Sequence, residues 1–212
     1  MRVEGVIKIM AFAILTGVIL MMSTGSADDD AWQRQWEARQ KALEAVLGAA
    51  DDKVLHSPVP FHLDGAADVL VFRKHNEGVV YVTADLIGDD RSKPNSLGQY
   101  ELMICTPKDS DWAPQLISNL AKYTIVAVLN PNDTMDIGPA LPKPSEVSAF
   151  LYLPYSKLEV EGKKSAVMLC LGITSAELKF IQNNDVEILV KALKKAGIYP
   201  MTDLSRSSVP LP

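Results

Sequence analysis

Cysteine is scarce in this sequence: the 212 residues include only Cys105 and Cys170. A fold that depends on disulfides needs several of them, so a disulfide-built scaffold is excluded. Each of the two cysteines closes or occupies an apolar run, where a free thiol behaves as a small hydrophobic side chain. A Cys105–Cys170 disulfide is the alternative in an oxidising compartment.

The sequence also lacks an excess of positive charge. It has 21 Lys and Arg against 26 Asp and Glu, which gives a formal net charge of −5. Proteins that bind nucleic acid usually present a basic surface, so we expect no nucleic-acid partner. Apolar residues make up 48% of the chain and charged residues 22%, which indicates a globular domain with a packed core.

Common catalytic and metal-binding motifs are missing as well. There is no Gly-x-Ser-x-Gly, no Gly-x-x-x-x-Gly-Lys-Ser/Thr, no Cys-x-x-Cys and no His-Glu-x-x-His pattern. The histidines His56, His62 and His75 fall in predicted loops or turns at spacings that match no common zinc site. We therefore expect no catalytic residue, no metal and no cofactor.

No apolar run is long enough to cross a membrane comfortably. The run Ile9–Met22 has 14 residues, follows Arg2 and Lys8, and precedes the small residues Ser23–Ala27. This layout predicts a signal peptide over residues 1–27, cleaved after Ala27, and hence a secreted or periplasmic protein. The alternative is a membrane anchor formed by uncleaved residues 9–22.

Beyond the leader, the chain alternates apolar runs with helical patterns. Strands are predicted over Asp68–Arg73, Val79–Ala84, Tyr100–Ile104, Thr124–Leu129, Ser148–Leu153 and Ser165–Ile173, and helices over Ala31–Leu47 and after the caps Asp111, Thr174 and Asp185. The strand–helix–strand order of Gly98–Val128 is typical of mixed α/β domains. We expect an α/β (α+β) fold with a mixed central sheet of about five to six strands flanked by helices.

One polar cluster combines Asp85, Asp89, Asp90 and Arg91. Its carboxylates could bind a hard cation such as calcium, although the spacing is not that of an EF-hand loop. The other interpretations are a solvated loop with a local ion pair and a surface that contacts a partner. The residues alone leave these three open.

Four blocks of sequence follow one another between Pro60 and Arg206. They are the run Asp68–Arg73, Tyr81–Arg91 with its Asp-Leu-x-Gly-Asp, Gly98–Tyr123 with its Glu-Leu and Trp…Leu-Ala-Lys-Tyr, and Val167–Arg206 with its Gly-Ile-Thr-x-x-Glu-Leu and Thr-Asp-Leu-Ser-Arg. In this order they resemble the suppressor of fused (SUFU) domain, and bacterial single-domain members resemble the chain most. The tyrosine of Asp-Leu-Tyr-Gly-Asp in animal members is Ile87 here.

The resemblance implies a non-enzymatic domain that binds a protein. Animal members grip a short extended peptide by strand addition, and many bacterial members are taken to be immunity proteins that neutralise toxins. Carried over residue by residue, the motifs imply two sets of partner-binding candidates. These are Asp85, Leu86, Gly88, Asp89 and Arg91 in the first set, and Thr202, Asp203 and Arg206 in the second.

These observations divide the chain into four segments. They are the signal peptide 1–27, an N-terminal helix and linker 28–56, a SUFU-like domain 57–206 and a disordered tail 207–212. The leading hypothesis is an exported protein-binding domain of immunity or regulatory type. The alternatives are a periplasmic hydrolase or metal-dependent enzyme that uses Asp85, Asp89 and Asp90, and a structural component of the cell envelope.

Overall fold

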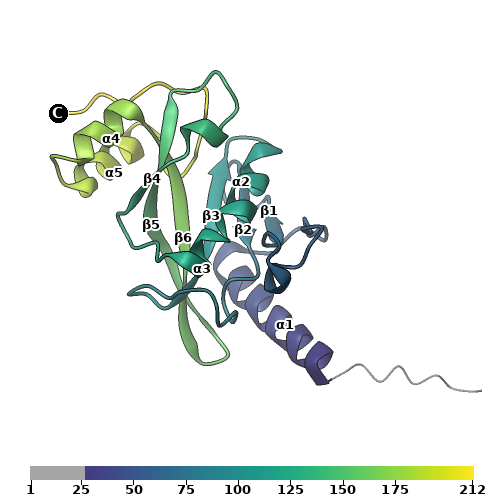
Figure 1. Cartoon of the computed structure of the whole chain (residues 1–212). Coiled ribbons are helices and arrows are strands. Elements are labelled where there is room, and N and C mark those ends of the chain that lie inside the picture. Colours follow the sequence, from purple (N-terminus) through teal and green to yellow (C-terminus); the bar gives the residue numbers. More distant parts are fainter. Residues whose placement is uncertain (1–26) are drawn as a thin grey trace, which may run out of the picture.

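The computed structural model describes residues 27–212, which form a six-stranded mixed sheet with helices on both faces (Figure 1). The strands are β1 (Val69–Phe72), β2 (Val79–Thr83), β3 (Gln99–Thr106), β4 (Thr134–Asp136), β5 (Val147–Val160) and β6 (Lys163–Thr174). The α-helices are α1 (Ala27–Leu47), α2 (Trp112–Leu120), α3 (Tyr123–Val126), α4 (Ser175–Ile181) and α5 (Val186–Lys195), and the 3-10 helices are η1 (Phe61–Leu63) and η2 (Gly138–Ala140).

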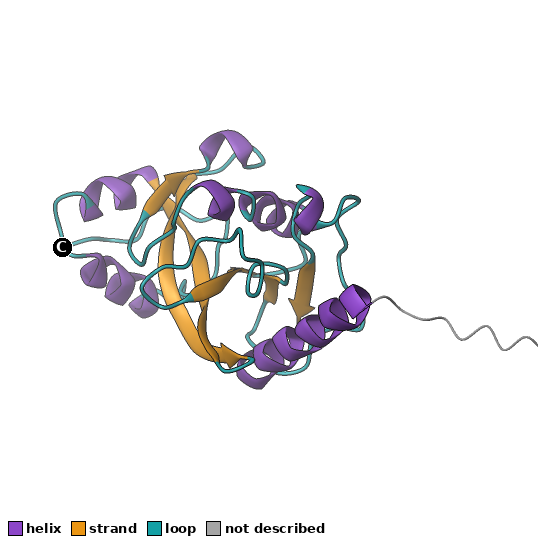
Figure 2. Cartoon of the chain, turned by 60° about the horizontal axis from the view of Figure 1, so that its bottom comes forward, coloured by secondary structure: helices purple, strands orange, loops and turns teal. Residues whose placement is uncertain are grey.

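The strand order is β1-β2-β3-β6-β5-β4. Strands β3 and β6 are parallel, and every other neighbouring pair is antiparallel. The long β5 and β6 form a hairpin closed by Glu161 and Gly162, both at positive φ, and Figure 2 shows this curved pair between the helices. The predicted α/β class, with a mixed sheet and flanking helices, is confirmed.

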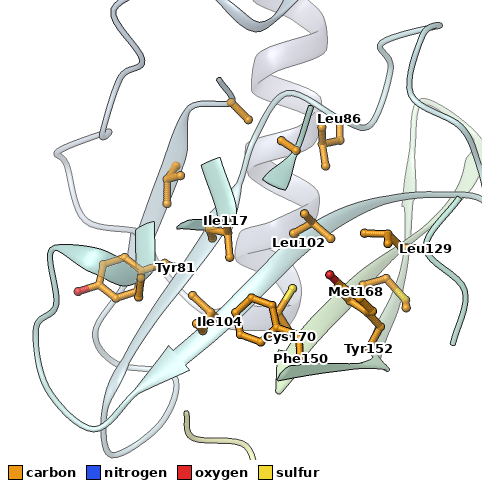
Figure 3. Packing of buried hydrophobic residues seen from close by; sticks show 14 of the residues in the cluster. Tyr81, Leu86, Leu102, Ile104, Ile117, Leu129, Phe150, Tyr152, Met168 and Cys170 are labelled. Atoms are coloured by element: carbon orange, nitrogen blue, oxygen red, sulfur yellow. The ribbon is translucent and has the colours of Figure 1, made fainter. Parts of the chain in front are cut away.

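The strands are continuous runs of apolar residues because helices cover both faces of the sheet. In β1, Val69 and Val71 point to one face, and Leu70 and Phe72 point to the other. Helices α2 and α3 cover the first face, whose core appears in Figure 3. Helices α1, α4 and α5 cover the second.

Helix α1 packs on the second face through residues one helical turn apart. Leu43 and Leu47 are buried there, and the chain then returns along β1, where Leu55 pairs with Val69. The predicted N-terminal helix and linker therefore pack onto the sheet. No helix within residues 27–212 is long and apolar enough to cross a membrane. Apart from Ala27, the predicted signal peptide lies outside the described residues.

Three local features between residues 110 and 147 differ from the sequence predictions. The predicted strand Thr124–Leu129 begins instead with α3, in which the Thr124 amide donates to Ala121, because a short apolar run does not distinguish strand from helix. Strand β4 lies in residues 130–147, over which the sequence predicts no strand. Asp111 is at the N-cap of α2, as predicted, but its side chain forms no capping hydrogen bond, and Ser110 accepts one from the amide of Ala113 instead.

Two further predictions are corrected by the packing. The tail 207–212 is not disordered, because the buried Val209 donates its amide to the Glu177 carboxylate. Cys105 and Cys170 are both free and buried, and they pack in the cores on opposite faces of the sheet. Neighbouring strands direct these two thiols to opposite faces, so the disulfide alternative is wrong.

We expect Leu43→Ala to lower the free energy of unfolding by about 2–4 kcal/mol, because it leaves a cavity beneath α1. The measurement is urea unfolding followed by circular dichroism. Lys41→Ala, on the exposed side of the same helix, is the matched control and should change stability by less than about 0.5 kcal/mol. Equal effects of the two substitutions would show that α1 is not part of the cooperative fold.

Candidate partner-binding site

The first candidate set lies in the contact loop, which we define as residues 85–91 after β2. Glu101 of β3 holds this loop from beneath and is itself 0% exposed. Its Oε1 accepts hydrogen bonds from the amides of Leu86 and Ile87, each at 2.9 Å. Its Oε2 accepts a 2.6 Å hydrogen bond from the hydroxyl of Thr83. The Glu-Leu and Asp-Leu-x-Gly-Asp blocks of the sequence are thus physically joined.

Gln99 extends this attachment by two residues. Its side-chain oxygen accepts from the amide of Gly88, and its side-chain nitrogen donates to the carbonyl of Asp89, both at 2.9 Å. Gly88 has a φ of +96°, a region that favours glycine, and a Cβ there would overlap the side chain of Gln35. The glycine of the motif is therefore required by the shape of the loop.

Helix α1 binds the same loop from the other side. Arg39 donates a 2.6 Å hydrogen bond to the carbonyl of Ile87 and lies 3.8 Å from the carboxylate of Asp85. Gln35 donates to the carbonyl of Gly88 at 3.1 Å. Because Leu86 is itself buried in the core beside Leu102 (Figure 3), the loop is fixed between the sheet and α1.

Burial controls the protonation of two carboxyls here. It raises the pKa of Glu101 to about 7, although Arg39 and the loop amides act in the opposite direction. Burial also raises the pKa of Asp85, against the hydrogen bond from the amide of Asp68. For Asp89, burial is outweighed by the hydrogen bonds from Arg91, and its pKa is lowered.

Arg91 ties the contact loop to η1. Its guanidinium contacts Asp89 at 2.8 Å and Asp64 at 3.1 Å, and it donates to the carbonyl of Phe61 at 2.7 Å. It also lies over the ring of Phe61, 5.2 Å from the centroid. Arg91 therefore stabilises the loop, and part of its side chain remains accessible at the surface.

A pocket of about 570 Å3, which we call the loop pocket, brings most of the first set together. Asp85, Gly88, Asp89 and Arg91 line it, whereas Leu86 faces the core. The remaining lining residues are Trp32, Gln35, Arg39, Phe61, His62 and Asp90. Helix α1 thus contributes one wall, which no motif in the sequence indicated.

The second candidate set lies elsewhere, along the tail. Thr202 is buried and accepts a hydrogen bond from the amide of Gly172, while Asp203 accepts one from the amide of Ser205. Arg206 forms a two-pronged pair with Glu177 at 2.7 and 2.6 Å. Asp203 and Arg206 line a separate pocket of about 440 Å3, so the structure does not unite the two sets.

The pKa of Glu177 is shifted in the opposite direction to that of Glu101. Burial alone would raise the pKa of Glu177, but Arg206 and the amides of Thr174 and Val209 outweigh burial and lower it. The capping box of α4 is formed by Thr174 and Glu177, as the sequence predicts. The tail and the start of α4 thus share one ionised carboxylate.

The described residues contain no group of three or more His, Cys, Asp or Glu side chains placed to hold a metal ion. In the Asp85–Asp90 cluster, Asp85 accepts the amide of Asp68 and Asp89 is paired with Arg91. Protein donors thus already engage Asp85 and Asp89, and Asp90 alone does not form a metal site of several carboxylates. A metal-dependent reaction on this cluster has no support from its geometry.

Sequence reasoning missed the residues that hold the loop. Glu101 lies in the predicted strand Tyr100–Ile104, and Gln99 lies directly before it. A charged residue inside an otherwise apolar run is the one available signal for Glu101. Arg39, Gln35 and Trp32 gave none, because a polar residue on a surface helix is ordinary.

Comparison with solved structures identifies the class of fold. A SUFU homologue from Neisseria gonorrhoeae FA 1090 matches with a TM-score of 0.61 at 19% identity, over 85% of this chain and 99% of that chain. The Sufu-Fu complex matches with a TM-score of 0.62 at 11% identity, over 82% of this chain and 91% of that chain. The chain has the SUFU-type α/β fold.

The family follows from the sequence comparison. The model described as Suppressor of fused protein (SUFU) matches residues 65–207. The chain belongs to the SUFU family, as the resemblance of its four blocks predicted. No curated protein sequence gives a significant match.

We expect the effect of Glu101→Gln on stability to depend on pH. Glutamine keeps an oxygen for the loop amides but cannot ionise. Because burial raises the pKa of Glu101 from 4.5 to about 7, the folded state binds the proton more tightly than the unfolded chain does. This contribution to stability is complete below pH 4.5 and is lost as the pH rises through 7.

The wild type should therefore lose stability relative to Glu101→Gln between pH 5 and pH 8, by on the order of 3 kcal/mol at most. Urea unfolding of both proteins at each pH measures the difference, and the other titrating groups cancel in it. A difference that does not change with pH would contradict the shift.

Proposed function

We propose that this chain is a non-enzymatic protein-binding domain that is exported and acts as an immunity-type or regulatory binder. Membership of the SUFU family carries this proposal, since the family binds protein partners in eukaryotes. One of the matching structures, the Sufu-Fu complex, is named as a complex between two proteins.

The contact loop supports binding over catalysis. Its backbone groups and most of its charges serve the fold, with Leu86 and Ile87 held by Glu101 and Asp89 held by Arg91. A catalytic carboxylate needs free oxygens directed at a substrate. A rigid loop with an accessible rim is instead the usual design of a recognition surface.

Strand addition is the binding mode that the family resemblance favours, and the sheet has two outer strands. At β1, Leu55 pairs with Val69, and the amide of Asp51 donates to Val71. At β4, Thr134 and Asp136 are exposed, and the outer side pairs with no strand in residues 27–212. We therefore place a partner strand at β4 rather than at β1, as a contact of the partner separate from its contact with the loop toward the other edge of the sheet.

Affinity capture tests the proposal. Tagged protein should retain a specific partner from native extract, identified by mass spectrometry, and Asp89→Ala/Arg91→Ala should lose it because the loop detaches from η1. Lys157→Ala/Glu159→Ala, an exposed pair on β5, is the matched control and should retain the partner. No partner for the folded wild type, or equal capture by both variants, would contradict this assignment.

Export is a separate part of the proposal and rests on the leader sequence. We expect the mature protein recovered from the envelope or medium to begin at Asp28, because cleavage falls after the small residue Ala27. Intact-mass measurement of the recovered protein checks this. A full-length mass in the membrane fraction would instead support the anchor alternative.

A further inference from the structure

The loop pocket offers one carboxylate that the fold does not use. Of its carboxylates, Asp85 faces Arg39 and accepts the amide of Asp68, and Asp89 is paired with Arg91. Asp90 is exposed, and within the described part of the chain it forms no hydrogen bond or ion pair. The uncompensated charge of the pocket is therefore negative and is concentrated at Asp90.

The rim of the pocket carries an aromatic surface. Trp32 is 46% exposed and stacks on Trp36, with ring centroids 5.7 Å apart, so the indole is held in place. The other lining aromatic, Phe61, is already covered by Arg91. An indole face and a free carboxylate that line one pocket are a favourable environment for a cation.

Arg39 in the wall is not open to a ligand. It is 3% exposed, and its guanidinium donates to the carbonyl of Ile87 and lies 3.8 Å from Asp85. Its Nε has no hydrogen-bond acceptor among residues 27–212, but this atom is shielded from solvent. The groups that the pocket presents to a ligand are therefore Trp32 and Asp90.

We propose that the loop pocket receives an arginine or lysine of a partner peptide, with its cationic group between Trp32 and Asp90. An organic cation suits an indole and a single carboxylate, whereas the described residues hold no cluster of side chains placed for a metal ion. This inference rests on the proposed binding function and names the chemistry of its partner.

Two matched peptides test this inference on the full chain. The probe is Ac-Gly-Gly-Arg-Gly-Gly-NH2, and its control replaces arginine with citrulline, which has nearly the same shape without the charge. Titration followed by backbone amide NMR should move the signals of Gly88 and Asp90, with a dissociation constant on the order of 1 mM for so small a ligand. The citrulline peptide should bind about fivefold more weakly or worse.

Three variants locate the effect. Asp90→Asn should weaken binding of the arginine peptide about fivefold, and Trp32→Leu should weaken it similarly. Glu159→Gln, which neutralises an exposed carboxylate on β5, should leave it unchanged. The amide spectra also show whether each variant remains folded.

Equal affinity for the arginine and citrulline peptides, or equal losses in Asp90→Asn and Glu159→Gln, overturns the inference. Capture of the same protein partner by wild type and by Asp90→Asn also overturns it, while leaving the proposed function in place. Failure of the wild type to capture any partner bears on the proposed function instead, whatever the peptides do.

Discussion

The contact loop depends on a carboxylate that never reaches water. Glu101 is completely buried and accepts the hydroxyl of Thr83 and two consecutive amides of the loop. Burying such a group is expensive unless its oxygens are fully hydrogen-bonded, so the loop conformation that supplies those donors is strongly favoured. The alternative conformations would leave this carboxyl without hydrogen-bond donors inside the domain. The side chain of Glu101 thereby fixes the backbone conformation of the first part of the contact loop.

A second buried glutamate, Glu177, likewise holds separate parts of the chain together, but its pKa is shifted in the opposite direction. Glu177 faces the guanidinium of Arg206 at hydrogen-bond distance, whereas Arg39 near Glu101 donates to the carbonyl of Ile87 instead. A direct cation favours the ionised form, and a cation directed elsewhere leaves burial dominant. The pKa of Glu177 is accordingly lowered, and that of Glu101 is raised.

The sequence predicts the elements that depend on local patterns, but not those that depend on long-range contacts. A strand that is covered on both faces of the sheet, such as Val69–Phe72, is a continuous run of apolar residues, and such a run can be predicted as a strand from the sequence. The run Thr124–Leu129 was misassigned because its local pattern is the same for a helix, and the helical hydrogen bonds that continue from α2 decide its conformation. Long-range pairs such as Arg206–Glu177 leave no local pattern, which is why the tail could not be placed.

The candidate site is likewise only partly encoded in local sequence motifs. The motif Asp-Leu-x-Gly-Asp located the loop, but most of its atoms are used by the fold: Leu86 fills the core, Gly88 allows the turn, and Asp89 holds Arg91. The accessible side chains come largely from outside the motif: Trp32 lies on α1, and Asp90 directly follows the motif. The motif thus builds the frame of the pocket, while its rim comes from residues outside the motif. In the binding that we propose, the rim and α1 are therefore the parts that select the partner.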